Sequence, residues 1–218
     1  WDEPIRRAHL LMLPVRARIN RFNAMVRVCR KVCCARLLRS CAKLYPECDM
    51  LSPRSWWVGA AWPAEMERHQ RHCERAGADA GAFIVKPDNG CQGEGISLVR
   101  SHAELRELMA RPDAPQRALV QEYLPAPLLL EDGRKFDLRL YVILVDAAPL
   151  RAFLSARGVA RFASHPWAPV DAANQHDACM HLSNSSVNAP AAQGLSNKVA
   201  LERLWPALEK RGCDVRAL

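Results

Sequence analysis

Long apolar runs are missing from this sequence of 218 residues. Nowhere do about 18 uncharged apolar residues follow one another, which excludes a transmembrane helix. Internal repeats, low-complexity tracts and a charged-then-apolar leader are missing too, and the first residue is Trp1 rather than methionine, so we expect a fragment or an excised domain. Half of the residues are hydrophobic and a quarter are charged, which is typical of a folded globular protein.

Paired cysteine motifs are also missing. Among the nine cysteines, Cys29, Cys33 and Cys34 are crowded, but no C-x-x-C pair with a matching set of histidines or cysteines follows them. This spacing disfavours a zinc site. We therefore expect reduced thiols in a cytosolic protein.

The net charge of +8 is concentrated in the N-terminal quarter of the chain. Residues 1–54 contain 12 Lys and Arg against 4 Asp and Glu, whereas residues 55–218 contain 19 of each. We therefore divide the chain into a basic, helical N-terminal segment (1–54) and a neutral main domain (55–218). The basic segment favours a polyanionic partner, with nucleic acid, a membrane surface and an acidic protein tail as open alternatives. A well-solvated helical surface would give the same composition.

Apolar spacing and turn residues predict strands with helices between them. The expected helices cover residues 19–44, 65–76, 101–111 and 196–210. The expected strands cover 83–85, 96–99, 119–124 and 136–145, followed by a hairpin that pairs 150–155 with 159–163 around Gly158. Residues 46–63 are predicted as an extended apolar connection and the polar run 181–188 as a loop. This order indicates an α+β or mixed α/β fold.

Two helix ends carry local sequence signals. Ser101 and Glu104 form an S-x-x-E capping box, which predicts that a helix begins there and ends before Pro112. Pro206 suits the first turn of a helix, so we expect the C-terminal helix to restart at that residue.

A glycine-rich segment follows the first strand of the main domain. Lys86 lies at the end of that strand, and glycines occupy positions 90, 93 and 95. Glycines let backbone N–H groups approach phosphate oxygens, and a lysine can neutralise phosphate charge. The spacing matches neither a P-loop nor the dinucleotide-binding fingerprint. Nucleotide binding and an ordinary tight turn both remain open from this segment alone.

The segment 133–142 alternates between charged and apolar residues. In a strand, one face would belong to the core and carry Phe136, Leu138, Leu140 and Val142. The opposite face would carry Lys135, Asp137, Arg139 and Tyr141. That order of cation, anion and cation suits a phosphate and ribose or a metal-bound ligand, and it equally suits a surface strand with ion pairs.

Several segments, taken in order, resemble one family. They are Lys86-Pro87 with Gln92-Gly93-Glu94-Gly95-Ile96, then Val120–Leu124, Gly133–Arg139 and His181–Asn184. Upstream, Ser52-Pro53-Arg54-Ser55-Trp56 is similar to the family's phenylalanine–proline–arginine–threonine–tryptophan signature. From about residue 19 to its end, the chain resembles the tubulin–tyrosine ligase-like proteins.

This resemblance implies an ATP-grasp fold, in which two α+β lobes clasp ATP. It implies an ATP-dependent carboxylate–amine ligase that works through an acyl phosphate. Residues 91–93 and Arg161 look like those of polyglutamylases, which add glutamate to glutamate side chains of tubulin tails. A glycylase or a tyrosine ligase of the same family is the alternative. The implied cofactors are ATP and Mg²⁺.

The resemblance also implies roles for individual residues. Nucleotide contacts are expected from Lys86, Gln92, Gly93, Gln121, Glu122, Tyr123, Leu124, Lys135, Phe136, Asp137, Ser183 and Asn184. Catalytic roles are expected for Arg139 and Arg161, and Arg161 matches the arginine whose bidentate fork binds the carboxylate of the amino-acid substrate. Contacts to that substrate are expected from Arg161, Ser185, Ser186 and Lys198.

Two features depart from the family pattern. Ser185 stands where the family usually has tyrosine. The family's Mg²⁺ ligands lie in a later strand, so we expect them downstream of residue 218 and expect residues 55–218 to be a partial domain, inactive alone. A catalytically inactive, microtubule-binding relative is therefore a further alternative.

The implied partners are glutamate and tubulin or microtubules, whose acidic tails would attract the basic segment. Nucleic acid is disfavoured because few aromatic residues are interleaved with the basic ones, and no membrane partner is expected. The implied location is the cytoplasm and cytoskeleton, with the cilium or basal body left open.

Overall fold

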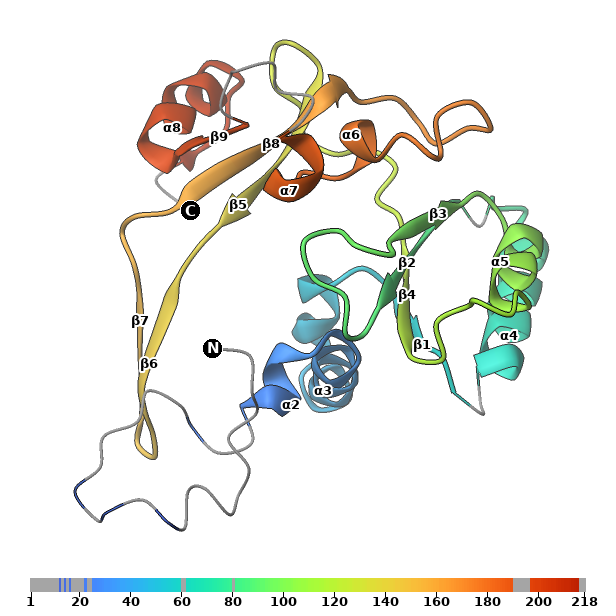
Figure 1. The fold of residues 1–218 in the computed structure, drawn as a ribbon, viewed down its shortest axis with the longest axis horizontal. Coiled ribbons are helices and arrows are strands. Elements are labelled where there is room, and N and C mark those ends of the chain that lie inside the picture. Colours follow the sequence, from blue (N-terminus) through green and yellow to red (C-terminus); the bar gives the residue numbers. More distant parts are fainter. Residues whose placement is uncertain are drawn as a thin grey trace.

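The computed structural model describes residues 12, 14, 16, 22, 25–59, 62–79, 81–189 and 197–215. Figure 1 shows two sheet-containing parts, with a long two-stranded arm extending from one of them. Helices and antiparallel strands are mixed along the chain, as the predicted α+β class requires. No helix within these described ranges is long and apolar enough to cross a membrane.

The first sheet has four antiparallel strands in the order β1-β4-β2-β3. They are β1 (Ser55–Trp57), β2 (Phe83–Pro87), β3 (Ser97–Val99) and β4 (Ala118–Glu122). The predicted strands near 83–85, 96–99 and 119–124 are confirmed within two residues. Helices α4 (Trp62–Ala76) and α5 (His102–Met109) cover one face. The core on this side consists of Trp56, Met66, Phe83, Val85, Val99, Leu105, Ala118 and Val120.

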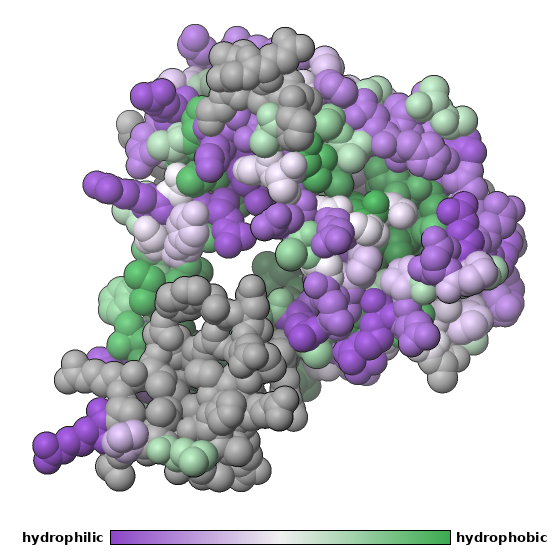
Figure 2. Space-filling view, in the orientation of Figure 1, coloured by the Kyte–Doolittle hydropathy of each residue, from purple (hydrophilic) through white to green (hydrophobic). Residues whose placement is uncertain are grey.

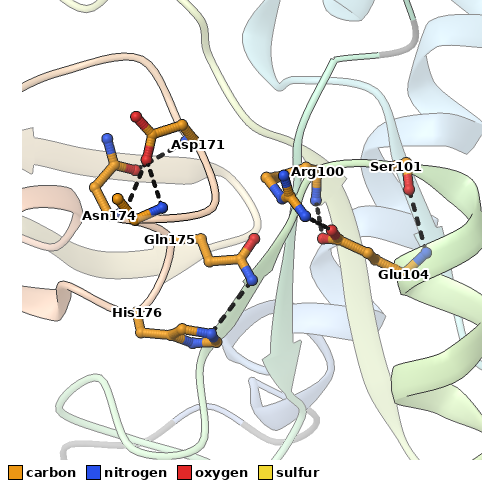
Figure 3. A network of polar contacts seen from close by, with 8 residues as sticks. Arg100, Ser101, Glu104, Asp171, Asn174, Gln175 and His176 are labelled. Carbon is orange, nitrogen blue, oxygen red and sulfur yellow. Dashed lines mark hydrogen bonds and ion pairs between the residues drawn. The ribbon is translucent and has the colours of Figure 1, made fainter.

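The capping box at α5 forms as predicted, with one change. The Ser101 hydroxyl accepts a hydrogen bond from the Glu104 N–H at 3.2 Å, so Ser101 caps the helix. Glu104 Oε2 accepts from the N–H of Arg100 at 2.8 Å, one residue earlier than the usual box (Figure 3). The backbone N–H of Arg100 lowers the pKa of the Glu104 carboxyl. The helix ends at Met109, before Pro112, as expected.

The N-terminal segment packs on the other face of this sheet. It forms α2 (Val26–Cys29), α3 (Lys31–Leu44) and the short 3-10 helix η1 (Pro46–Leu51). Val32 and Ala35 of α3 are buried against Leu119 of β4, with Trp57 at the edge of the cluster. The predicted helix over 19–44 is confirmed from residue 26 onward, except for a break at Arg30, whose backbone is extended. Residues 19–21, 23 and 24 of that prediction lie outside the described residues.

The predicted extended connection over 46–63 is wrong at both ends. Pro46 stands in the first turn of η1, and Trp62 and Pro63 open α4. Proline lacks an N–H that would be unpaired in a first helical turn, so it begins these helices instead of preventing them. The extended part is limited to the neighbourhood of β1, where Trp56 enters the core.

The second sheet has three antiparallel strands in the order β5-β8-β9. They are β5 (Arg134–Arg139), β8 (Val159–Pro166) and β9 (Lys198–Ala200). Helix α8 (Leu201–Lys210) covers one face and buries Leu201, Leu204 and Leu208 against Ala160 and Phe162. The short helices α6 (Ala178–His181) and α7 (Ser185–Asn188) lie between this sheet and the first one (Figure 1).

The predicted strand 136–145 is wrong as a single element. The chain leaves the sheet after Arg139 and continues as β6 (Val142–Ala147), which pairs with β7 (Leu150–Leu154) to form the arm. Apolar side chains of the arm are exposed, including Val142, Ile143, Leu150, Phe153 and Leu154. Figure 2 shows apolar residues along the arm where it emerges from behind the grey atoms. The expected core face therefore ends at Leu138, since Leu140 and Val142 are exposed.

The predicted hairpin between 150–155 and 159–163 is also wrong. β7 pairs with β6, whereas β8 pairs with β5 and β9. Gly158 serves a close approach instead of a turn: a Cβ there would lie 2.5 Å from Leu201 Cδ1 and 2.9 Å from the Arg139 carbonyl oxygen. A glycine beside a strand can mark either a turn or a close approach of another segment, and at Gly158 it marks a close approach.

Three predictions for the C-terminal part of the chain need correction. The stretch predicted as helix over 196–210 begins with β9, and Ser196 lies outside the described residues. Helix α8 runs without a restart through Pro206, which lies in its second turn. The polar run 181–188, predicted as a loop, forms the end of α6 and all of α7. His181 and Asn188 in this run are fully buried because their polar atoms find partners there.

Candidate functional site

One lysine from each sheet contacts the strand end at residues 121–123. Lys86 Nζ, near the end of β2, donates to Gln121 Oε1 at 2.7 Å. Lys135 Nζ, on β5, donates to the backbone oxygen of His181 at 2.9 Å and lies 5.0 Å from the centre of the Tyr123 ring. The two acceptors are a neutral amide oxygen and a carbonyl oxygen, so both ammonium groups still attract an anion.

Burial and a neighbouring positive charge lower the pKa of both lysines. Burial and the charge of Lys31 lower the pKa of Lys86. Burial and the charge of Lys86 lower the pKa of Lys135 to about 8. Two partly buried cations that destabilise each other are typical of a site that binds a polyanion, because the anion relieves their repulsion.

A second group of polar residues adjoins Lys135 on the same face of β5. Asp137 and Arg161 are direct cross-strand partners on β5 and β8. Arg161 Nε lies 2.8 Å from Asp137 Oδ1 and its Nη2 lies 2.5 Å from Oδ2, so the pair is bidentate. The buried Ser183 hydroxyl donates to the same Oδ2 at 2.7 Å. Hydrogen bonding to Asp137 raises the pKa of Arg161.

The glycine-rich loop (residues 88–96) reaches from β2 to α7. Gln92 has φ 56°, and Gly93 and Gly95 have φ 91° and 66°, a backbone region that favours glycine. Gln92 O accepts a hydrogen bond from Ser186 Oγ at 2.6 Å. A Cβ on Gly93 would lie 2.7 Å from Val187 Cγ2 and 3.4 Å from Asn184 Oδ1, so only glycine fits beside α7. The loop thus brings Gln92 and Gly93 next to Asn184 and Ser186, a contact that the sequence did not predict.

The strand end Gln121–Leu124 distributes its side chains among several neighbours. Gln121 Nε2 donates to Ser55 Oγ at 2.8 Å while its Oε1 accepts from Lys86. The Tyr123 hydroxyl lies 3.0 Å from His181 Nδ1, and burial raises the pKa of the phenol. Leu124 is exposed.

Glu122 points to the opposite side of the strand end. Its Oε1 lies 3.3 Å from His69 Nε2 and 3.9 Å from Arg54 Nη1, and burial raises the pKa of its carboxyl. His69 Nδ1 in turn lies 3.1 Å from His102 Nε2, and both imidazoles are buried. Burial lowers the pKa of both histidines. The side chain of Glu122 is therefore engaged by His69 and Arg54, and its nucleotide contact stays a prediction.

Three of the predicted residues lie away from the lysine pair. Phe136 packs on the core side of β5 with the cluster around Phe162. Arg139 is exposed at the end of β5, with its guanidinium 5.7 Å from the centre of the Tyr141 ring. Lys198 lies on β9 directly opposite Arg161, which places it near the predicted amino-acid position. Ser185 begins α7, next to Asn184 and Ser186.

Several residues around the site were not singled out from the sequence. His181 is fully buried: its Nδ1 meets the Tyr123 hydroxyl and its Nε2 lies 3.2 Å from Asn174 Oδ1. Trp167 Nε1 donates to the same Tyr123 hydroxyl at 3.2 Å. The signal for His181 was present, since it opens the His181–Asn184 segment, whereas nothing local marks Asn174 or Trp167.

A separate cavity of about 390 Å³ lies behind β3, between α5 and the segment 175–182. Its lining includes Ile96, Leu98, Glu107 and Gln175 but neither site lysine. Figure 3 shows how Asp171, Asn174, Gln175 and His176 follow one another beside the start of α5. Asp171 Oδ1 accepts from the N–H of Asn174 at 2.8 Å, which fixes this turn at the cavity mouth. The cavity is therefore distinct from the lysine site.

The described residues near the two lysines combine positive charge with a glycine-rich loop. Lys86 and Lys135 supply positive charge, and the loop brings backbone groups within reach of it. Among the residues with a described position, no three His, Cys, Asp or Glu side chains group to hold a metal ion. The Mg²⁺ ligands expected downstream of residue 218 remain a prediction.

Comparison with known proteins gives the same family throughout. A family model described as the tubulin-tyrosine ligase family matches residues 10–214. The chain is 34% identical over 195 residues to the human tubulin polyglutamylase TTLL13, covering 86% of this chain and 22% of that protein. It is 37% identical over 205 residues to the mouse tubulin polyglutamylase TTLL11, covering 91% of this chain and 28% of that protein.

A more distant organism gives a similar match. The chain is 34% identical over 211 residues to a probable beta-tubulin polyglutamylase of Tetrahymena thermophila, covering 92% of this chain and 17% of that protein. The chain therefore spans between about a sixth and three tenths of the length of these relatives. Most of the length of each relative lies outside the matched region.

Proposed function

The chain belongs to the tubulin-tyrosine ligase family, and from this premise we propose that the protein is an ATP-dependent ligase that adds glutamate to glutamate side chains of tubulin C-terminal tails. The observation that carries the proposal is the pair of lysines, Lys86 on the first sheet and Lys135 on the second, whose hydrogen bonds go to neutral oxygen atoms. The two sheets act as the two lobes of an ATP-grasp fold.

In this proposal, the two lysines bind the phosphates of ATP, and the glycine-rich loop covers them with Gln92 and Gly93. The segment from Gln121 to Leu124 lies along the adenine. Asp137, Ser183 and Asn184 complete the nucleotide contacts, with Arg139 available for phosphate or acceptor charge. The partial burial of both lysines supports this role, because a low local dielectric strengthens their attraction for phosphate.

Arg161 is proposed to bind the carboxylate of glutamate. Its guanidinium is already engaged by Asp137 through two nitrogens, so glutamate binding requires part of that pair to be exchanged. Ser185 and Ser186 on α7 and Lys198 on β9 supply the surrounding contacts. When bound, ATP supplies the phosphoryl group that activates the acceptor carboxylate. Cations around that carboxylate and the phosphates reduce their mutual repulsion and align them.

The acidic tail of tubulin is proposed to approach along the basic N-terminal helix. Arg36 and Lys43 are exposed on α3, while Arg39 lies 4.1 Å from the centre of the Trp57 ring. Their charge would accelerate encounter with an acidic chain at low salt. The cytoplasm and the cytoskeleton follow as the proposed location, with the cilium or basal body as a possible site of action.

The test is mass spectrometry of tubulin tails incubated with the full-length protein, ATP, Mg²⁺ and either glutamate, glycine or tyrosine. Added glutamate supports the proposal, and loss of that addition in Lys86→Met and Lys135→Met ties it to the lysine pair. Addition of glycine or tyrosine instead keeps the ligase and overturns the substrate.

A second candidate is a microtubule-binding relative without catalysis. Ser185, at the position where the family usually has tyrosine, favours it. This candidate predicts that ATP and tubulin bind but that no amino acid is added under any of the three conditions. Ser185→Tyr gives a sharper comparison, because restored or increased transfer would show that the position limits the reaction.

A further inference from the structure

The first residues of α3 hold the base of the glycine-rich loop. Lys31 Nζ donates to the Pro87 carbonyl oxygen at 2.9 Å and also to the carbonyl oxygen of Gly90. Arg30, at the break before α3, donates from Nη1 to Asn89 Oδ1. The loop is therefore attached to a helix that lies nearly sixty residues earlier in the sequence.

Asp88 provides the anionic half of the same attachment. Its side chain is fully buried, and its Oδ1 accepts from the backbone N–H of Val32 at 3.0 Å. The first N–H groups of a helix have no partner within the helix, and a carboxylate there also interacts favourably with the helix dipole. Asp88 Oδ2 lies 3.2 Å from Arg117 Nη2, which balances its charge. The loop thus caps α3 while α3 holds the loop.

Lys31 also contributes charge to the nucleotide site. Its charge lowers the pKa of Lys86, whose charge in turn lowers the pKa of Lys135. The three lysines come from α3, β2 and β5, which are far apart in sequence. Two of the three Lys31 donors are directed at loop carbonyl oxygens, so its position is set by the loop that it supports.

The far side of the loop is attached separately. Ser186 holds the Gln92 carbonyl oxygen at 2.6 Å, and Gly93 packs against Val187. One end of the loop therefore depends on α3 in the first part of the molecule, and the other depends on α7 near the second sheet. A change at either attachment alters where the loop backbone lies relative to Lys86.

We propose that Lys31 and Asp88 are positioning residues of the nucleotide site: together they fix the glycine-rich loop to the N-terminus of α3, and Lys31 places its positive charge at the base of that loop. This inference rests on the proposed binding of ATP. It gives the basic N-terminal helix a second task, because its first turn supports the nucleotide loop while its exposed residues remain available to an acidic partner.

The charge part is tested with Lys31→Met and a matched control, Lys43→Met, which removes the same charge from the exposed end of the same helix. ATP binding to the full-length protein is measured by calorimetry at low and moderate salt. Lys31→Met weakens binding about tenfold, the effect of losing one charged contact, while Lys43→Met changes it less than about twofold. Equal effects of the two variants would overturn the role of Lys31 and leave only general electrostatic attraction.

The attachment part is tested without nucleotide, by amide hydrogen exchange of residues 88–96. Asp88→Ala raises exchange in this loop about tenfold or more, and Asp88→Asn, which keeps an oxygen for the Val32 N–H, restores most of the protection. Unchanged loop exchange in Asp88→Ala would overturn the attachment. So would a rise of equal size throughout β2 and β4, since that would indicate general destabilisation.

Kinetics separate this inference from the proposed function. In an active protein, Asp88→Ala raises KM for ATP about tenfold while kcat changes less than about threefold. If the wild type binds no ATP in the calorimeter, the proposed function fails, yet loop exchange still decides the attachment. The proposed function stands and this inference fails under three results together. The wild type binds ATP, Lys31→Met and Lys43→Met change that binding equally, and Asp88→Ala leaves the exchange of the loop unchanged.

Discussion

Strands β5 and β6 follow each other in one alternating sequence pattern, but β5 is packed in a core and β6 is exposed. β5 pairs with β8 and packs under α8, so Phe136 and Leu138 join a core while Lys135 and Asp137 join the candidate site. β6 continues from β5 after two residues, pairs with β7 alone among the described strands, and leaves most of its apolar side chains exposed. Alternation selects a face, but only a covering element turns that face into a core.

The largest difference in stability is expected between two phenylalanines, one in the β5-β8 sheet and one in the arm. Phe162→Ala removes a buried ring from the β5-β8 sheet and lowers the free energy of unfolding by about 3–5 kcal/mol. Phe153→Ala in the arm removes a ring that is 59% exposed and costs less than about 1 kcal/mol. Denaturant unfolding of the two variants checks this. Equal losses would mean that the arm is as well packed as the sheet.

Two arginines extend the contrast from stability to activity. Arg161→Ala breaks the bidentate pair with Asp137 and is expected to lower kcat/KM for glutamate about a hundredfold. Arg151→Ala removes the exposed pair with Asp146 in the arm, at 3.5 Å, and is expected to leave transfer unchanged. The measurement is glutamate incorporation into tubulin. Full activity of the Arg161→Ala variant would refute the role given to that residue.

The candidate site on the second sheet is also expected to depend on pH. Lys135 has a pKa of about 8, below the ordinary value, so the folded protein loses this charge first as pH rises. ATP affinity should then fall up to about tenfold between pH 7 and pH 9. Over the same rise in pH the free energy of unfolding increases, because Lys135 still binds its proton in the unfolded state after losing it in the folded state. Lys135→Arg should flatten the affinity curve. A wild-type curve that is already flat would contradict this.

The smallest effect on stability is expected from a charge on the arm. Leu150→Lys replaces an exposed apolar side chain on an edge strand, so the free energy of unfolding should change by no more than about 0.5 kcal/mol. Exposed apolar edges promote association between chains, and lysine opposes it. Light scattering on concentrated samples should therefore decrease. A loss of more than about 1.5 kcal/mol would show that Leu150 is covered by something in solution.

Local features could be predicted because they depend on short segments. Lys86 lies near the end of β2, as its position before Pro87 predicted, and the helix cap at Ser101 depends only on residues three positions apart. The roles given to the site residues stay predictions. The strand partners could not be predicted in the same way. Nothing local distinguishes β7 pairing with β6 from β7 pairing with β8, because the choice depends on α8 and on the close approach at Gly158.

Buried polar residues were the second feature that could not be predicted from the sequence alone. The run from His181 to Asn188 looked like a loop because polar residues usually lie at the surface. Its residues His181 and Asn188 are nevertheless buried, because they meet distant partners, Tyr123 for His181 and Ser164 for Asn188. Those partners lie at least 24 residues away, so one sequence alone does not reveal them.

The strand end at residues 121–123 has a consequence for tolerance to insertion and deletion. Gln121 bonds to Lys86, Glu122 lies against His69, and Tyr123 meets His181, so three successive side chains connect to three different elements. A deletion of one residue would turn each side chain to the opposite face and break all three connections together. Evolution and engineering can therefore change the length of this chain at the Gly77 turn or in the arm far more easily than at this tripeptide.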